Sequence, residues 1–252
     1  MNIALENIAF AYDKAAFLQG ITAELAPGKV HFLAGPNGSG KSTLLKISAG
    51  YLTPDAGKIK LDDRDLTAYS GMERARHLGV MWQSSNPALD FTVREMVEIT
   101  ASARFPRLQK LSSTDEEIIE NSLAAFGLSS LTNRRVNTLS GGERQRVMLA
   151  GMVTLAPDVM LLDEPTSALD PAHRNSAFAL LEEYAQTHTV LVITHDLELL
   201  ARAAGTVWLL DMQKNFYAGN AEEILTEETL SKVYNATAQV AKENTRRRIY
   251  FD

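Results

Sequence analysis

The stretch over residues 29–48 constrains the fold of this chain more than any other. A short apolar run, 29–34 (KVHFLA), stops at a glycine-rich segment over 35–40, and residues 42–48 carry apolar side chains at helical spacing. A strand, a glycine loop and a helix in direct succession are typical of α/β folds, in which helices join parallel strands. We therefore expect an α/β fold with a largely parallel sheet that contains this unit.

The glycine loop fits the pattern G-x-x-x-x-G-K-[ST], which binds the phosphate groups of nucleotides. Glycines let the backbone curl until successive N–H groups face the phosphate oxygens, and the positive end of the following helix faces them too. Lys41 is expected to reach the β- and γ-phosphates, and Ser42 is expected to ligate Mg²⁺. A glycine turn with a chance lysine is the alternative, but it does not explain the flanking strand and helix. The predicted nucleotide-binding residues are Gly35, Pro36, Asn37, Gly38, Ser39, Gly40, Lys41, Ser42 and Thr43.

Two carboxylates follow an apolar run further along the chain. Residues 159–162 are all apolar, and Asp163 and Glu164 come directly after them. In α/β sheets, functional side chains gather at the carboxyl ends of buried strands. Asp163 is therefore expected to hold Mg²⁺ through a water molecule, and Glu164 to polarise a water in line with the γ-phosphate. A solvated acidic turn is the alternative for this motif taken alone.

Other apolar runs predict the remaining organisation. Strands are expected at 2–10, 78–82, 158–162, 189–194 and 205–210, and a helix is expected at 171–186. The segment 90–155 is interpreted as a helical insertion, with helices at about 92–103, 114–126 and 141–154. The prediction is one domain over 1–252, with a core at about 1–89 and 156–215, a helical subdomain at about 90–155 and a short C-terminal extension at about 216–252. Three arginines in this extension, 246–248, are expected to be solvated.

Composition and charge exclude several classes of protein. The chain has 252 residues, of which 45% are apolar, so it can bury a core without disulfides. It contains no cysteine, which excludes thiolate metal sites and cysteine nucleophiles. Its longest stretch without a charged side chain, 77–89, is shorter than the roughly 20 residues that a membrane-spanning helix needs. The net charge of −6 argues against nucleic acid as a partner.

A second glycine turn, 139–145 (LSGGERQ), precedes a predicted helix. Its backbone N–H groups, a serine hydroxyl and the helix N-terminus together could bind an anion. A plain helix cap, with Ser140 as the capping residue, explains the same pattern equally well. One phosphate loop suffices for one nucleotide, so a second anion site in the chain needs an explanation.

The explanation comes from a family whose signature sequence this turn resembles, the ATP-binding-cassette (ABC) ATPases. The other motifs stand in the family's order between residues of about 2 and 215, and the residues that resemble its Q-loop glutamine, switch histidine, D-loop aspartate and adenine-stacking aromatic are Gln83, His195, Asp170 and Tyr12. The resemblance implies a P-loop (RecA-like) core with an inserted helical subdomain. It also implies the roles of individual residues. The catalytic residues would be Glu164, His195 and Gln83, and the Mg²⁺ ligands would be Ser42, Gln83 and Asp163. The signature, which would close over the nucleotide of a second copy, comprises Ser140, Gly141, Gly142 and Gln145.

The resemblance further implies an ATPase that binds ATP with Mg²⁺ and pairs head to tail with a second copy of itself. A single cassette without a spanning segment resembles the peripheral subunit of a bacterial importer at the cytoplasmic face of the inner membrane. Its partners would be polytopic permease subunits and, indirectly, a periplasmic or surface substrate-binding protein. The stretches 87–97 and 221–234 are similar to those of ATPases that serve haem, ferric-siderophore and cobalamin importers. A soluble ABC ATPase of iron–sulphur assembly and the ATPase subunit of a lipid or drug exporter remain alternatives.

A docking surface for the permease is expected over about 83–107. This segment begins at the predicted Q-loop, so a change at the nucleotide can move it. It is rich in apolar residues and has three arginines as polar anchors, namely Trp82, Pro87, Leu89, Phe91, Val93, Met96 and Val97 with Arg94, Arg104 and Arg107. The alternative is that the apolar residues build the core of the helical subdomain.

Overall fold

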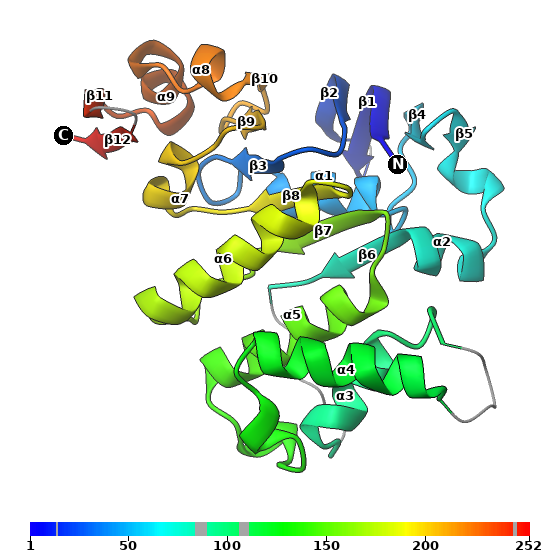
Figure 1. Ribbon diagram of the computed structural model, residues 1–252. Coiled ribbons are helices and arrows are strands. Elements are labelled where there is room, and N and C mark those ends of the chain that lie inside the picture. The colour runs from blue at the N-terminus through cyan, green and yellow to red at the C-terminus, as the bar shows by residue number, and fades with distance from the viewer. Residues whose placement is uncertain (14, 84–89, 106–110, 244–245) are drawn as a thin grey trace. The chain divides into compact units, whose positions relative to one another are not determined.

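The computed structural model describes residues 1–13, 15–83, 90–105, 111–243 and 246–252 (Figure 1). The chain forms two compact units. Unit 1 comprises Met1–Tyr69 and Ala185–Asp252, and unit 2 comprises Ser70–Tyr184. The predicted division into a core, a helical subdomain and a C-terminal extension stays a prediction.

Unit 1 is built mainly from strands. They are β1 (Ile3–Tyr12), β2 (Ala15–Leu25), β3 (Val30–Ala34), β4 (Ala56–Leu61), β5 (Arg64–Asp65), β8 (Thr189–Ile193), β9 (Thr206–Leu210), β10 (Phe216–Asn220), β11 (Ala238–Glu243) and β12 (Arg246–Phe251). Its helices are α1 (Lys41–Ser48), α7 (Leu197–Ala201), α8 (Ala221–Ile224) and α9 (Glu227–Tyr234), with a 3₁₀ turn, η1 (Leu66–Ala68). The strands predicted at 2–10, 29–34, 189–194 and 205–210 are confirmed as β1, β3, β8 and β9.

Two sheets of unit 1 position the glycine loop. An antiparallel sheet has the order β2-β1-β4-β5, and β3 pairs in parallel with both β8 and β9, while β10 runs antiparallel to β9. Every residue of β3 and β8 is buried, as expected for parallel strands that are covered on both faces. The strand that leads into the glycine loop is therefore fixed along both of its edges.

Unit 2 combines two parallel strands with helices. Its elements are α2 (Gly71–His77), β6 (Leu78–Met81), α3 (Val93–Thr100), α4 (Ser113–Ala125), η2 (Ser129–Leu131), η3 (Val136–Thr138), α5 (Gly141–Leu155), β7 (Val159–Asp163) and α6 (Pro171–Ala185). Strand β6 pairs in parallel with β7. The strands predicted at 78–82 and 158–162 and the four predicted helices are thereby confirmed. Helices α3, α4 and α5 each begin at a capping box, in which a serine or threonine and an acidic residue satisfy backbone N–H groups of the first turn.

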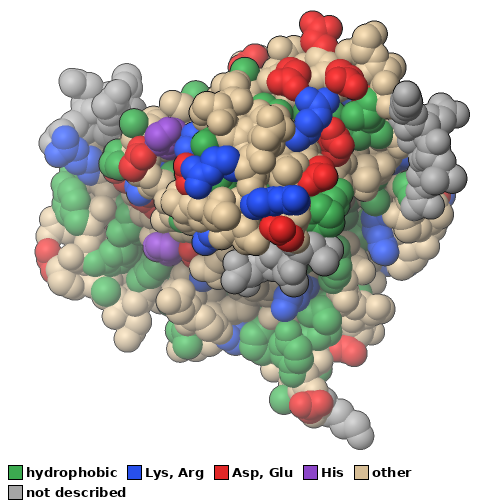
Figure 2. Space-filling model, turned by 90° about the horizontal axis from the view of Figure 1, so that it is seen from below, with side chains coloured by type: hydrophobic (Ala, Val, Ile, Leu, Met, Phe, Trp, Pro, Cys, Tyr) green, Lys and Arg blue, Asp and Glu red, His purple; other side chains and the backbone are tan. Residues whose placement is uncertain are grey.

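The helices of unit 2 are held together by packing and by one charged network. Val93, Met96 and Val97 of α3 are all buried. Arg94 of α3 bonds Glu98 at 2.9 Å, Glu116 of α4 at 3.2 Å and also Glu120 of α4. On the face seen in Figure 2, basic and acidic side chains are likewise intermixed. The network therefore joins α3 to α4 on the outside of a shared apolar core.

This burial corrects part of the expected docking surface over 83–107. Val93, Met96 and Val97 build the core of unit 2, because their exposed fractions are 0%, 6% and 0%. Arg104 donates to the Thr154 carbonyl of α5 at 3.1 Å, so it anchors the segment inside the same unit. Phe91 is half-buried. Pro87, Leu89 and Arg107 lie outside the described residues.

The C-terminal part of unit 1 also differs from the prediction. A hairpin of β11 and β12 pairs Ala238 with Phe251, and the three arginines lie on β12. The Arg247 side chain is only 9% exposed, and its guanidinium lies 3.8 Å from Glu222 and donates to the Ala201 carbonyl at 3.4 Å. The expectation of a fully solvated run was wrong for Arg247, because a strand turns alternate side chains to opposite faces.

We expect His31 to make the stability of the chain depend on pH. The imidazole is buried in β3, its Nε2 bonds the Ala26 carbonyl at 2.7 Å, and its Nδ1 accepts from the Thr206 N–H at 3.0 Å. Burial lowers the pKa of His31. The unfolded histidine therefore takes up a proton near pH 6.5 while the folded one stays neutral, so stability falls as the pH drops below about 6.5.

Denaturant unfolding at pH 7.5 and pH 5.5 tests this expectation. The parent should lose more stability between the two values than His31→Gln, whose amide can make both hydrogen bonds but does not titrate. His188→Gln is the control, because it replaces a half-buried histidine just before β8 in the same unit, whose ring bonds the Thr187 hydroxyl at 2.9 Å outside the buried strands, and it should behave like the parent. An equal loss in the parent and in His31→Gln would contradict the prediction.

Candidate functional site

The glycine loop of unit 1 is shaped by a close backbone contact. A Cβ on Gly35 would lie 2.0 Å from the Leu210 carbonyl oxygen of β9, and Gly35 has a φ of +142°. No residue with a side chain fits there, because the space is filled and the backbone conformation is one that only glycine adopts readily. The loop therefore turns directly against β9 before α1 begins after Gly40.

Lys41 lies on the loop that it follows. Its side chain is buried, and its Nζ donates to the Gly35 carbonyl at 2.8 Å and to the Pro36 carbonyl at 3.0 Å. The ammonium is thus held within the curve of the loop, where successive N–H groups and a helix N-terminus favour an anion. An ammonium group, backbone N–H groups and a helix N-terminus are together suited to bind the negative charge of a polyphosphate. The individual phosphate contacts predicted for 35–43 stay predictions.

Tyr12 lies beside the end of the same loop. Its hydroxyl is 3.2 Å from the Thr43 Oγ1, and its ring contacts Phe10 and Phe17 edge-on, with centroids 4.8 and 5.2 Å away. Tyr12 is 43% exposed. The structure therefore places Tyr12 beside the phosphate loop, and its stacking on adenine stays a prediction.

The carboxylates of unit 2 lie where β7 ends. Asp163 is its last residue and is 6% exposed, and Glu164 follows with a φ of +50°. Gln83 donates from its Nε2 to the Glu164 Oε2 at 3.0 Å. A left-handed conformation is unusual for glutamate and is often kept at functional sites. The structure thus brings together two of the predicted catalytic residues, although their roles stay predictions.

The second glycine turn is capped by its own chain. Ser140 accepts from the Glu143 N–H at 3.2 Å, and the Glu143 carboxylate accepts from the Ser140 N–H at 2.7 Å. Hydrogen bonds to the carboxylate from the Ser140 N–H and the Ser140 hydroxyl lower the pKa of Glu143. The turn also packs closely, since a Cβ on Gly142 would lie 2.8 Å from the Ala168 carbonyl oxygen. Ser140 is therefore a helix cap in the single chain, and its contact with a nucleotide of a second copy stays a prediction.

Gln145 has contacts that the sequence did not indicate. Its Oε1 accepts from the Ala168 N–H at 2.9 Å, and its Nε2 donates to the Glu164 carbonyl at 2.7 Å. The residue is only 9% exposed. Its carboxamide thus ties α5 to the turn that carries Glu164. The predicted contact of Gln145 with a partner's nucleotide stays a prediction, and this intramolecular bridge is a separate finding.

Two further predicted residues have fixed surroundings. Asp170 accepts from the His173 N–H at 2.9 Å and bonds the His173 ring at 2.7 Å, and these bonds lower the pKa of Asp170. His195 is exposed in the turn between β8 and α7, where Asp196 caps α7 through two backbone N–H groups. Both residues therefore occupy turns next to helix starts.

Comparison with known proteins identifies the family of this chain. The family model for ABC transporters matches residues 18–167. The chain belongs to the ABC transporter family. The hemin import ATP-binding protein of Pseudomonas entomophila is 39% identical over 236 residues, or 91% of each chain. The ferric enterobactin transport ATP-binding protein of Escherichia coli K12 is 32% identical over 93% of this chain and 88% of that protein.

Solved structures give the same family. A metal-chelate type ABC transporter in an inward-facing conformation aligns over 99% of this chain and 96% of that chain, with 30% identity and a TM-score of 0.81. The predicted family, the mixed α/β fold class and the ATPase domain of this ABC protein are thereby confirmed. ATP is accordingly its nucleotide.

We expect Gln145→Leu to slow ATP hydrolysis more than it weakens ATP binding. The substitution removes the side-chain bond to the Ala168 N–H and one of the bonds to the Glu164 carbonyl, which keeps the Ser167 hydroxyl at 3.1 Å, so the turn that carries Glu164 can shift. Each lost buried bond is worth roughly 1–3 kcal/mol, so kcat should fall about tenfold or more. The dissociation constant for ATP should stay within about twofold, since Lys41 and its loop are unchanged.

Steady-state kinetics and nucleotide titration measure the two effects. Gln239→Leu, at an exposed glutamine of β11 that bonds Asp252, is the matched control and should match the parent. Hydrolysis by Gln145→Leu at the parent's rate would contradict the prediction.

Proposed function

We propose that this chain is the ATP-hydrolysing subunit of a bacterial importer that takes up haem, an iron chelate or a cobalamin-type cargo through permease subunits on other chains. The observation that carries the proposal is the match to the hemin import ATP-binding protein, which extends over 91% of both chains. The ferric enterobactin relative supports the wider class of iron chelates. Among the described residues, no helix is long and apolar enough to span a bilayer. By analogy with the import ATP-binding relatives, the proposal places the membrane path in other subunits, with this chain peripheral at the cytoplasmic face of the inner membrane.

Nucleotide binding falls to unit 1 in this proposal. The loop over 35–43 cradles the β- and γ-phosphates, Lys41 neutralises their charge, and Tyr12 stacks on the adenine. The loop's curvature, the buried ammonium and the exposed ring next to Thr43 support these roles. Binding energy from the base and the phosphates then holds the γ-phosphate in one position for attack.

A magnesium ion is expected at this site, and the oxygen donors fit it. Mg²⁺ is usually held by one or two carboxylates, hydroxyls and substrate phosphates rather than by a full protein cage. Ser42, Asp163 and Gln83 would hold the ion, and when bound it supplies charge neutralisation at the phosphates.

Hydrolysis is assigned to Glu164. Its carboxylate accepts a proton from the attacking water or orients that water, and the hydrogen bond from Gln83 supports a defined carboxylate position. His195 is proposed to contact the γ-phosphate. The two groups come from different units, and their meeting at one nucleotide rests on the family resemblance.

The signature is proposed to act on the other copy of the chain. Ser140, Gly141, Gly142 and the start of α5 would close over the nucleotide that is bound by the partner's loop, with Asp170 at the same interface. Each chain binds one nucleotide on its own phosphate loop, so the second glycine turn has no ligand within its own chain. Contact with the partner's nucleotide would give this turn its role. The transport cycle then alternates between an ATP-bound closed dimer and an open form after hydrolysis.

We expect Glu164→Gln to abolish hydrolysis and uptake while keeping ATP binding. The amide has the shape of the carboxylate but cannot accept the proton, so the rate should fall by roughly 10²–10⁴-fold. Removing the negative charge should also stabilise the ATP-bound dimer. The measurements are ATPase rate and uptake of haem and a ferric siderophore by vesicles containing the reconstituted transporter.

Glu182→Gln, on the exposed side of α6, is the control for the loss of one carboxylate. Near-parent hydrolysis by Glu164→Gln would contradict the role of Glu164. Failure of the parent to associate with any permease-containing membrane would contradict the importer and favour a soluble assembly ATPase.

A mixed dimer tests whether the signature acts across the interface. One chain carries Lys41→Ala and the other carries Ser140→Arg. If Ser140 contacts the partner's nucleotide, both lesions fall on one site and the other site stays intact. We therefore expect one functional ATP site per mixed dimer in single-turnover binding. Two impaired sites and no intact one would show that Ser140 acts within its own chain.

A further inference from the structure

The turn between β9 and β10 carries a lysine in an unusual backbone conformation. Lys214 has a φ of +70°, a left-handed conformation that glycine adopts at much lower cost than a residue with a side chain. A strained lysine in a surface turn needs a contact that compensates for the strain. The turn belongs to unit 1, as does the phosphate loop.

The turn itself is held firmly by one buried carboxylate. Asp211 is 3% exposed, its Oδ1 accepts from the Asn215 N–H at 2.8 Å, and its Oδ2 accepts from the Asn215 side chain at 2.7 Å. The Lys214 N–H donates to the Asp211 carbonyl at 3.1 Å. These bonds fix the backbone of the turn and with it the direction in which the Lys214 side chain leaves.

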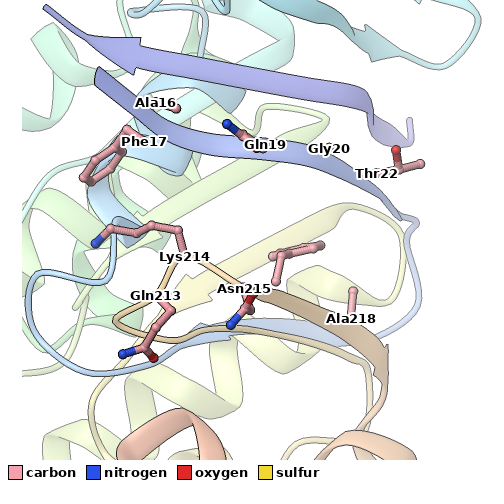
Figure 3. A pocket seen from close by; sticks show the side chains of 10 residues that line it. Ala16, Phe17, Gln19, Gly20, Thr22, Gln213, Lys214, Asn215 and Ala218 are labelled. Atoms are coloured by element: carbon pink, nitrogen blue, oxygen red, sulfur yellow. The ribbon is translucent and has the colours of Figure 1, made fainter. Parts of the chain in front are cut away.

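The Lys214 side chain reaches the phosphate loop. Its Nζ donates to the Gly38 carbonyl at 2.6 Å and lies 4.6 Å from the centroid of the Phe17 ring. Figure 3 shows it extending toward Phe17 at the edge of a cavity of about 710 Å³ between β2 and the turn. One cation thus joins three separate segments, the turn, β2 and the loop. An ammonium–carbonyl bond is charge-assisted and therefore stronger than a neutral one.

The peptide that Lys214 holds is part of the loop's own turn. The next N–H, that of Ser39, donates to the Pro36 carbonyl at 3.2 Å. Because a peptide unit is planar and trans, fixing the Gly38 carbonyl on the outer side also fixes the direction of the Ser39 N–H. The Lys214 contact therefore stabilises the closed turn 36–39 at the tip of the loop.

Aromatic side chains continue this support along the loop. A Cβ on Gly40 would lie 3.0 Å from the Phe17 ring, so the ring packs on that part of the backbone. Tyr12 contacts Phe17 and reaches Thr43. Lys214, Phe17 and Tyr12 thus contact the loop at its tip, its middle and its end.

We propose that Lys214 is a positioning residue of the nucleotide site, which holds the phosphate loop in its binding conformation from outside. A loop that is already ordered loses less entropy when phosphate binds, so affinity rises. The cation also adds positive potential next to a site for a polyanion. The inference rests on the proposed role of the loop over 35–43 in binding the phosphates, and it assigns to a turn lysine an effect on affinity for both ATP and ADP.

Three variants at this position separate the ammonium from the backbone. Lys214→Met keeps the length of the side chain and removes its charge, whereas Lys214→Gly removes the side chain and relieves the strained φ. Lys214→Arg keeps the charge and the donors. Lys242→Met is the matched control, because Lys242 is an exposed lysine whose Nζ lies 3.5 Å from Glu222. The measurements are dissociation constants for ATP and ADP by titration, and thermal unfolding of each nucleotide-free variant.

We expect Lys214→Met and Lys214→Gly to bind both nucleotides about 3- to 10-fold more weakly than the parent, since an exposed charge-assisted bond is partly screened. Lys214→Arg and Lys242→Met should bind within about twofold of the parent. The glycine variant should be at least as stable as the parent, so its weaker binding cannot come from unfolding.

Parent-like affinity in Lys214→Met or in Lys214→Gly would overturn the inference, and so would a loss in Lys214→Arg as large as in Lys214→Met. In each of these cases the parent still binds ATP, so the proposed function stands. If the parent itself binds neither nucleotide, both the proposed function and this inference fail.

Discussion

The contact between the Gly35 backbone and the Leu210 carbonyl of β9 is the constraint on which the phosphate loop depends. A Cβ at Gly35 would lie 2.0 Å from that oxygen, so the loop can turn there only as glycine. Strand β3 is paired on both edges and buried throughout, so it delivers the loop to a fixed point. This packing fixes where the loop leaves β3, and the bonds from the Lys41 Nζ to the Gly35 and Pro36 carbonyls then hold the start of the loop.

In unit 2, the turn that carries Glu164 is held in place by the side chain of Gln145. Glu164 follows the buried strand β7 in a left-handed conformation, and its carbonyl accepts from the Gln145 carboxamide at 2.7 Å. Gln145 also accepts a hydrogen bond from the Ala168 N–H, and the Gly142 backbone packs directly against the Ala168 carbonyl. The signature turn and the turn after β7 therefore form one hydrogen-bonded cluster. A displacement of either turn is opposed by the same buried amide.

The sequence predicted the positions of site residues where the same residue types are needed for the local backbone turn and for the ligand. The glycine loop and the acidic end of β7 were predicted correctly in place, because their residue types are required by the local turn as well as by the ligand. The position of Met96 was predicted wrongly, because the sequence pattern of an apolar residue on a helix is the same whether the residue faces the core or a partner protein. Gln145 and Lys214 were missed as supports for the turns, because their contacts join segments far apart in the chain.

The helix starts explain why the two glycine turns are not equivalent. Helix α1 begins after Gly40, which has no side chain to cap it, whereas α5 is capped by Ser140 and Glu143. A phosphate at α1 therefore meets a helix start without a built-in cap, while an anion at α5 must share or displace the Ser140 hydroxyl and stand near the Glu143 carboxylate. The proposed anion site at α5 would therefore be the weaker one in a single chain. A weak site of this kind contributes most when another group already holds the anion, which is what a nucleotide bound on the loop of a second copy would provide.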